Sequence, residues 1–190
     1  MTALAACGSH YEPPEPKRLS PEVCLAQLDQ FHVRYVKEAA PEGPCPIYDS
    51  VRVSDVGATL SRPALMGCDL ALTLEKFNRE VVQPQAQIHF HQKVTEIIHF
   101  GAWSCRGRPG GEWSEHAKGE AIDIAGFKLA DGATVSVKYD WDPPGPKRDF
   151  LRAVARGACG VFNMVLTPKS NSEHANHFHL DIGPYRGCGA

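Results

Sequence analysis

Two short segments in the second half of the chain contain residue types that bind metal ions. Residues 114–123 place His116 and Asp123 seven positions apart, and residues 174–179 hold three histidines in the order His-x-x-His-x-His. Two imidazoles and one carboxylate suit zinc, and three protein ligands leave a fourth tetrahedral position for water. A zinc ion with such an open position supplies hydroxide near neutral pH. We therefore expect His116, Asp123 and one of the three later histidines to form a hydrolytic zinc site.

The pattern of apolar residues predicts that both segments include strands. Residues 121–125 form a short, mostly apolar run, and apolar and polar side chains alternate through residues 177–182. Residues i and i+2 of a strand share a face, so His177 and His179 should point to the same side. One of them can then bind the metal while the other transfers protons. Gly119 lets the backbone between the first two ligands bend.

A second His-x-His sequence, His89 and His91, serves as a comparison. It falls in residues 85–98, which we predict to be helical. Side chains two positions apart on a helix point about 200° away from each other and share no face. We do not expect this pair to bind a metal.

The first segment also matches a known motif. The pattern Ser-x-His-x-x-Gly-x-Ala-x-Asp fits without a gap at Ser114, His116, Gly119, Ala121 and Asp123. The later His-x-x-His-x-His matches the penicillin-insensitive murein endopeptidase. On these motifs the chain resembles the extensin-like C-terminal domain family of bacterial proteins, over about residues 20–190. Through that family it resembles the LAS group of zinc peptidases, which also includes D-Ala-D-Ala carboxypeptidases and dipeptidases.

The resemblance implies roles for individual residues. It implies that His116, Asp123 and His179 bind Zn²⁺. The LAS group also places an arginine on the strand before the first motif, and Arg106, at the end of residues 101–106, fits that place. A guanidinium there could bind a substrate carboxylate through two parallel hydrogen bonds.

One position departs from the LAS carboxypeptidases. They carry a glutamate three residues before the last ligand, whereas this chain has Asn176. His177 is then the best substitute for the general base, and His174 and Glu173 are the next candidates.

The resemblance implies hydrolysis of an amide bond in peptidoglycan stem peptides or cross-links, by a zinc metallopeptidase. An alternative of another class is a non-catalytic, zinc-containing module that binds peptidoglycan or organises the envelope. The missing glutamate favours this alternative, and the matching histidines oppose it.

Three further residues each have two interpretations, and a fourth has one. Asp181 could orient a ligand imidazole or lie on the surface at a strand end. Trp103 and Trp113 could line a substrate groove, although packing in the core is the more common role. Ser114 could cap the loop that carries His116.

Composition limits the class of protein. The chain has 190 residues and a formal net charge of −2, which fits one domain and gives no basic footprint for nucleic acid. No apolar run reaches the roughly 18 residues of a membrane-spanning helix. We expect a monomer that acts on a peptide substrate.

Seven cysteines are scattered along the chain with no Cys-x-x-Cys spacing. Scattered cysteines in a small domain indicate disulfides and an oxidising compartment. The resemblance implies that this compartment is the periplasm. Six of them can form three bridges. Cys24 and Cys45 flank the first predicted helix, so a local bridge between them is one candidate pairing.

The odd cysteine is Cys7, which follows Leu-Ala-Ala as in the lipobox of bacterial lipoproteins. The preceding stretch is shorter than a signal peptide, whose apolar region alone needs about 7–15 residues. Cys7 is therefore either a lipidated membrane anchor or a free cysteine. Residues 8–17 are polar and proline-rich. We divide the chain into a lipobox remnant and flexible tether, 1–19, and one zinc peptidase-like domain, 20–190.

The remaining pattern predicts an α+β fold, in which N-terminal helices pack on a small antiparallel sheet that carries the site. Ser20 should cap the first helix and Asp69 the second, and Pro84 should separate the second helix from the third. The expected helices are 20–33, 69–82, 85–98 and 150–158, the expected strands 51–53, 121–125, 162–166 and 177–182, with a hairpin in 126–137 and a loop at 140–147.

Overall fold

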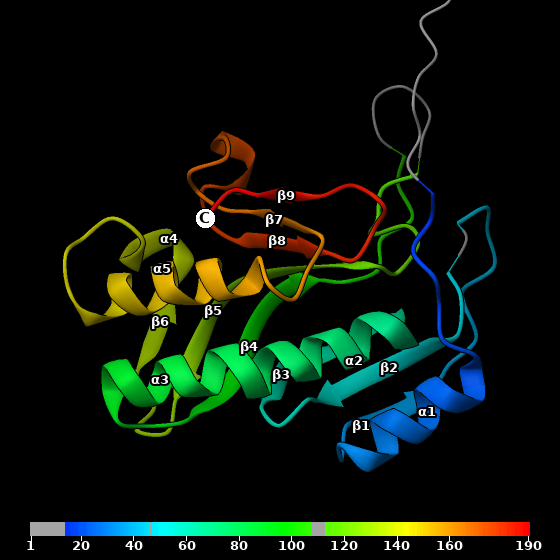
Figure 1. The fold of residues 1–190 in the computed structure, drawn as a ribbon, viewed down its shortest axis with the longest axis horizontal. Helices are drawn as coiled ribbons and strands as arrows, with labels where there is room; N and C mark the ends of the chain where they lie inside the picture. The colour runs from blue at the N-terminus through cyan, green and yellow to red at the C-terminus, as the bar shows by residue number, and fades with distance from the viewer. Residues whose placement is uncertain (1–13, 46, 108–112) are drawn as a thin grey trace, which may run out of the picture.

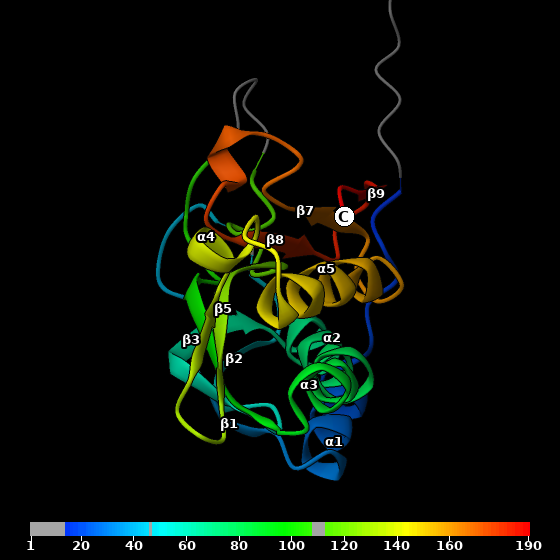
Figure 2. The same ribbon diagram turned by 90° about the vertical axis from the view of Figure 1, so that its left-hand side faces the viewer.

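The computed structural model describes residues 14–45, 47–107 and 113–190. Its described residues form one sheet of nine strands, in the order β1-β2-β3-β4-β5-β8-β7-β9, with β6 paired to β5 (Figure 1). Helices α1, α2, α3 and α5 lie along the same side of this sheet (Figure 2). The strands are β1 Arg34–Lys37, β2 Ser50–Asp55, β3 Thr59–Gly67, β4 Val94–Gly101, β5 Ala121–Leu129, β6 Thr134–Ser136, β7 Met164–Leu166, β8 Phe178–Asp181 and β9 Gly187–Cys188. The helices are α1 Pro21–Gln30, α2 Cys68–Phe77, α3 Gln83–Phe90, α4 Val137–Asp140 and α5 Pro146–Ala158, with a π-helical segment Asn78–Val82 and a 3-10 turn Ser172–His174.

The prediction of a fold with both helices and a sheet is confirmed, but the prediction that the sheet is small and antiparallel is wrong. The sheet is large and mixed, because β3 runs parallel to β4 and β7 runs parallel to β9. Parallel neighbours need a long crossover connection. Residues 68–90, which form α2, the π-helical segment and α3, provide that connection between β3 and β4.

The helix α1 begins as predicted and ends early. The Ser20 hydroxyl accepts a hydrogen bond from the backbone N–H of Val23 at 3.4 Å, and Pro21 occupies the first turn. The helix ends at Gln30 rather than at Val33, and the chain continues into β1, which the sequence pattern did not predict.

The next helical region differs from the prediction at both marked residues. Asp69 does not cap α2, because the N-cap is Gly67, and the Asp69 carboxylate instead accepts the backbone N–H of Leu19 at 3.4 Å. Pro84 does not separate two helices. The wider π-helical turns, in which the N–H of Gln83 bonds to the carbonyl of Asn78, place Pro84 in the first turn of α3.

The predicted helix over 85–98 is wrong in its second half. Helix α3 ends at Phe90, where His91 takes a left-handed conformation with φ of 56°. Residues 94–98 are mostly β-branched and form β4, as their side chains favour. The Gln83 side chain bonds both backbone polar groups of Val94, at 2.9 Å and 3.2 Å, which fixes the start of that strand.

The C-terminal half follows the prediction more closely. A hairpin joins β5 to β6, with Gly132 at φ of 88° and the Asp131 carboxylate accepting the N–H of Ala133 at 2.8 Å. Helix α5 begins at Pro146, four residues before the predicted start, and α4 includes Asp140 at the edge of the predicted loop. Strand β5 extends to Leu129, beyond the predicted short strand.

The apolar side of β8 faces the helices and the polar side faces the candidate site. Phe178 is fully buried, and its ring lies 5.6 Å from that of Trp141. The apolar face of α5 is likewise buried, with Phe150 against Phe127 at 5.4 Å. Burial of Phe178 and Leu180 in this core leaves His179 on the opposite face of the strand.

The expectation of three disulfides among six cysteines is confirmed. Their pairing is not local, because the bridges join Cys24 to Cys68, Cys45 to Cys105 and Cys159 to Cys188. The suggested bridge between Cys24 and Cys45 is therefore wrong. Cys24 faces the start of α2, which packs on α1, and this contact between helices decides its partner.

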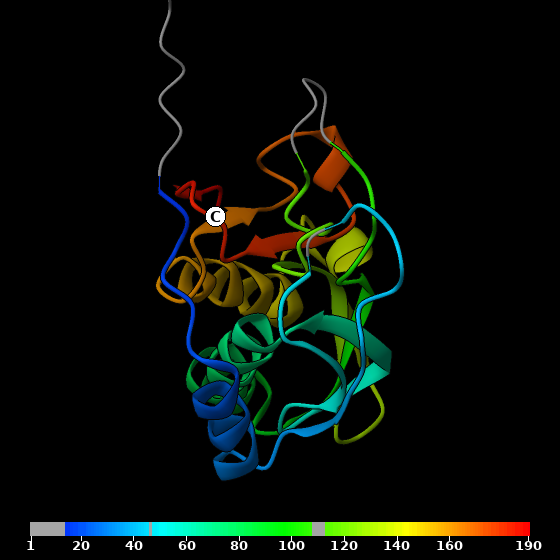
Figure 3. The ribbon, with the colours of Figure 1, turned by 90° about the vertical axis from the view of Figure 1, so that its right-hand side faces the viewer.

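The start of the chain contributes few described residues. Cys7, with its lipobox interpretation, lies outside them, and the domain boundary at residue 20 stays a prediction. The first described residues run along one edge of the molecule to α1 (Figure 3). Along this path Glu15 and Arg18 form ion pairs with Lys118 and Glu120. None of the described helices is long and apolar enough to cross a membrane.

Candidate metal site

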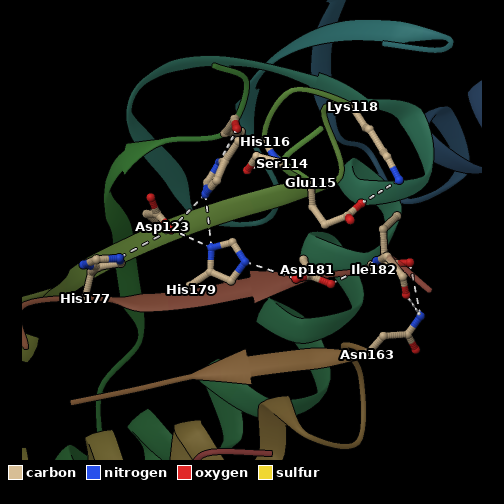
Figure 4. Close-up of polar contacts among 12 residues, drawn as sticks. Ser114, Glu115, His116, Lys118, Asp123, Asn163, His177, His179, Asp181 and Ile182 are labelled. Carbon is tan, nitrogen blue, oxygen red and sulfur yellow. Dashed lines mark hydrogen bonds and ion pairs between the residues drawn. The ribbon is translucent and has the colours of Figure 1, made fainter. Parts of the chain in front are cut away.

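Three side chains that are distant in the sequence bring one polar atom each to a common point (Figure 4). The Nε2 atom of His116 lies 3.2 Å from Oδ1 of Asp123 and 3.1 Å from Nδ1 of His179. The last two atoms lie 3.0 Å apart. Asp123 on β5 and His179 on β8 are direct partners across the antiparallel pair, so the sheet register fixes half of the site. We call these three residues the metal triangle.

The turn before β5 positions His116. The Ser114 hydroxyl accepts the backbone N–H of His116 at 3.3 Å, as expected for a capping residue. The carbonyl of Ala102, just past β4, accepts the ring Nδ1–H of His116 at 2.6 Å. Gly119 has φ of 70°, and a β-carbon there would lie 2.7 Å from the side chain of Ile47. Glycine at this position therefore allows the turn to close.

Asp181 performs the same task for His179. Its Oδ2 atom accepts the Nε2–H of His179 at 3.1 Å, and its Oδ1 atom accepts the backbone N–H of Gly183 at 3.0 Å. Asp181 is buried, so its interpretation as a surface residue is wrong. In both ligand imidazoles the far nitrogen is bonded to an oxygen acceptor. The near nitrogens can then direct lone pairs at a metal ion placed among the three atoms.

The triangle has the size that a zinc ion requires. In a tetrahedral site with bonds of about 2.0–2.1 Å, neighbouring ligand atoms lie about 3.3 Å apart. The three distances here, 3.0 Å to 3.2 Å, are close to that value. The His, Asp, His donor set and the bonded far nitrogens also fit zinc. Without a metal ion, protons on the imidazoles keep these three atoms from repelling one another. A metal ion at this point would take over that role.

The pKa values inside the triangle follow from the same contacts. Burial alone would raise the pKa of Asp123, but hydrogen bonds from His116 and His179 outweigh burial and hold that pKa well below its usual range. Burial alone would lower the pKa of His179. Its bonds to Asp123 and Asp181 outweigh burial and raise the pKa of His179 to about 9. The triangle therefore stabilises positive charge.

A fourth side chain, His177, lies beside the triangle. It precedes β8, which begins one residue later than predicted, yet it faces the site as expected. Its Nε2 atom lies 3.6 Å from Oδ1 of Asp123, and its Nδ1 atom lies 2.8 Å from Oδ1 of Asn176. The ring of Phe100 packs against it in an edge contact at 5.6 Å. Burial lowers the pKa of His177, which favours the neutral imidazole.

His174 completes a cluster of histidines. Its ring centre lies 5.1 Å from that of His177 and 5.9 Å from that of His179. Its Nδ1 atom lies 2.6 Å from Oδ1 of Asn171, at the start of the 3-10 turn. Burial lowers the pKa of His174 as well. Glu173, the other candidate base, is exposed in the same turn.

The cluster opens into a cleft of about 790 Å³. Arg106 lines this cleft. The resemblance had implied that it lies on a strand, but it lies in an irregular segment past β4. Cys105, bridged to Cys45, immediately precedes it and ties this segment to a second loop. The guanidinium is exposed, so it is free to meet a ligand in the cleft.

The family comparison agrees with these motifs. The family model described as extensin-like protein C-terminus matches residues 22–189. The chain belongs to this extensin-like family. No curated protein and no solved structure matches it. The resemblance to the extensin-like family is thereby confirmed.

The extensin-like domain also has cleft residues that the sequence pattern did not reveal. Met164 and Leu166 of β7 line one wall, and Tyr185 and Arg186 come from the loop after β8. No local signal marks them, because they reach the cleft only through the pairing of β7 with β8 and the return of the chain to β9.

The two tryptophans do not line the cleft. Trp103 is half-buried and donates its indole N–H to the carbonyl of Ala117 at 3.2 Å, and Trp113 lies in an isolated bridge with Gly107. The second His-x-His sequence also lies apart from the metal triangle. His89 lies in the last turn of α3 near Phe150, and His91 forms the helix cap.

Proposed function

We propose that this domain is a zinc-dependent amide hydrolase that acts on peptidoglycan stem peptides or cross-links. One observation carries the proposal: three acceptor atoms converge within 3.2 Å of one another, with a third imidazole, His177, beside them at 3.6 Å. A structural site would close the tetrahedron with a fourth ligand, whereas a catalytic site keeps a position open. Three ligands and an adjacent base are the set that hydrolysis needs.

A zinc ion held by the triangle would supply Lewis acidity and a water molecule of lowered pKa. The residues of the chain then have separate tasks. His177 takes the proton of the attacking water through Nε2 and passes it to the leaving amine. Asp181 and the carbonyl of Ala102 hold the two ligand imidazoles in their binding orientation. Arg106 holds a carboxylate of the peptide at the mouth of the cleft.

The substrate class and compartment rest on two supports. The likeness of the motifs to LAS zinc peptidases and murein endopeptidase indicates peptides of the cell wall. The three disulfides favour an oxidising compartment, which agrees with a periplasmic domain. Attachment to the membrane through a lipidated Cys7, and a monomeric state, belong to the same proposal.

The experiment is digestion of purified muropeptides, with separation of the products by chromatography and mass spectrometry. We expect amide cleavage by the zinc-loaded protein, loss of cleavage with a chelator and recovery on adding zinc back. The matched control is His89→Ala, which removes a histidine far from the cleft and should leave cleavage unchanged. No cleavage of any muropeptide by a protein that contains zinc would overturn the catalytic proposal.

The non-catalytic alternative has one observation in its favour. Asn176 stands where LAS carboxypeptidases carry a glutamate, and its side chain bonds His177 rather than entering the triangle. A binding module would retain zinc and sediment with peptidoglycan sacculi without releasing products. The digestion assay and a sedimentation assay on the same sample therefore separate the two functions.

A further inference from the structure

Two asparagine–histidine pairs lie side by side in the histidine cluster. Asn171 bonds His174 through Oδ1 and Nδ1 at 2.6 Å, and Asn176 bonds His177 through the same atoms at 2.8 Å. The two pairs differ in the surroundings of the second ring nitrogen, Nε2. The Nε2 atom of His177 lies 3.6 Å from Oδ1 of Asp123 in the metal triangle.

We propose that Asn176 is a positioning residue, which holds His177 in the tautomer with the proton on Nδ1. An amide oxygen can only accept a hydrogen bond, so Nδ1 of His177 must donate to it. In a neutral imidazole the other nitrogen, Nε2, then carries the lone pair. That lone pair lies 3.6 Å from Oδ1 of Asp123 and so beside the triangle, where a proton acceptor is needed. The catalytic consequence rests on the proposed function, whereas the tautomer is a property of the contact itself.

The surroundings of His177 show why a fixed tautomer matters. The ring is half-buried, held on one side by Phe100 at 5.6 Å and on another by His174 at 5.1 Å. If the proton were on Nε2 instead, the ring would point a donor at the carboxylate of Asp123. It would then present a proton rather than a lone pair to the triangle and could accept no proton from water.

Asn176 therefore has a use at the position where LAS carboxypeptidases have a glutamate. A glutamate at this position could itself act as the base, whereas an amide has no comparable basicity. The amide instead prepares the neighbouring imidazole. The base and its orienting residue are adjacent in the chain, so a single local contact defines the arrangement.

The test is the ¹⁵N spectrum of the histidine rings, recorded on the full chain with and without added zinc at a pH where His177 is neutral. The signals of His177 are assigned by their loss in His177→Gln. We expect the Nδ1–H tautomer in the wild type and in Asn176→Asp, whose carboxylate also accepts this bond. We expect Asn176→Leu, which has no acceptor, to shift the signal toward a mixture or toward Nε2–H.

Asn171→Ala is the matched control. It removes the bond to His174 and the side-chain cap of the 3-10 turn, so it loosens the same region without touching Asn176. We expect the tautomer of His177 to stay unchanged in this variant. A change equal to that of Asn176→Leu would assign the effect to general loosening and overturn the proposal.

Kinetics on muropeptides supply the second measurement. Asn176→Leu should lower kcat by about 10–100-fold with KM and zinc content unchanged, as for other residues that orient catalytic groups. Asn176→Asp should restore most of kcat. An Nε2–H tautomer in the wild type, or an unchanged spectrum in Asn176→Leu, overturns the proposal. A wild type without hydrolysis but with the Nδ1–H tautomer would overturn the proposed function and leave the positioning contact intact.

Discussion

Two carboxylates of the turn and strand that carry the first motif have opposite surroundings. Asp123 faces the imidazoles of the metal triangle, and three residues earlier Glu120 lies in an acidic cluster. This cluster consists of Glu15, Arg18, Glu115, Lys118 and Glu120. Burial would raise the pKa of both carboxylates. The imidazoles reverse that effect at Asp123, whereas at Glu120 burial and the charges of Glu115 and Glu15 exceed the attraction of Arg18 and raise the pKa to about 7.

The difference between Asp123 and Glu120 shows that burial alone does not make a carboxylate a candidate metal ligand. A carboxylate whose neighbours can share a cation with it keeps a low pKa and can act as a ligand. A buried carboxylate beside other carboxylates has a raised pKa and can hold a proton. Two acids, three residues apart, therefore have different chemistry because one faces β8 and the other faces the start of the chain.

The largest expected effect comes from breaking the metal triangle. His116→Ala or His179→Ala should reduce bound zinc from about one ion per chain to background, because two ligands cannot hold the ion against water. Elemental analysis of the dialysed protein measures this directly. Glu120→Gln should retain zinc in full, since Glu120 is not part of the metal triangle. Equal zinc in wild type and in both histidine variants would contradict the assignment.

The next effect separates chemistry from metal binding within the histidine cluster. His177→Ala should retain zinc and lower kcat by about 10²–10⁴-fold, the usual contribution of a positioned general base. Zinc content and kcat are measured on one preparation. Loss of zinc would make His177 a ligand. Full turnover with zinc bound would move the base to His174 or Glu173.

A smaller effect is expected at the mouth of the cleft. Arg106→Ala should raise KM for muropeptides with a free carboxylate by about 10–100-fold, as expected for a charge-assisted pair. Zinc content should not change. Arg148→Ala, at a half-buried position on α5 where the side chain pairs with Asp149, is the control for loss of an arginine. An unchanged KM for Arg106→Ala would leave Arg186 as the candidate for carboxylate binding.

The smallest expected effect concerns stability in the acidic cluster. The pKa of Glu120 is raised in the folded protein, so its stabilising contribution is complete below pH 4.5 and is lost as the pH rises to about 7. Glu120→Gln removes the ionising group. This variant should become more stable than the wild type as the pH rises through that range, as measured by urea unfolding under non-reducing conditions. Glu42→Gln, at an exposed position, should show no such gain.

The pH dependence should differ between the two regions. In the metal-free protein His179 has a pKa of about 9, above its ordinary value of 6.5. Its contribution to stability is therefore complete below pH 6.5 and is lost as the pH rises to about 9, which is opposite to the loss expected for Asp123 in acid. The same unfolding series, carried on to pH 9 without zinc, measures this second loss.

The features that depend on neighbours along the chain could be predicted from the sequence. The spacing of His116, Gly119 and Asp123 defines one turn and the strand after it, and alternation around His179 defines which face of β8 is polar. The Ser20 cap and the Asp131–Gly132 hairpin followed from local hydrogen bonding and backbone freedom. The family and the number of disulfides could also be predicted from sequence motifs and the cysteine count.

Contacts between residues that are distant in the sequence could not be predicted and are seen only in the tertiary structure. The register that sets Asp123 opposite His179, the partners of the three disulfides and the arrival of Arg186 at the cleft all depend on pairings across the sheet. The strand at 94–101 was mistaken for helix because a short apolar run fits both periods, and only the pairing with β5 distinguishes them. The role of Asn176 also required the structure, because an asparagine in the sequence does not show which ring it bonds.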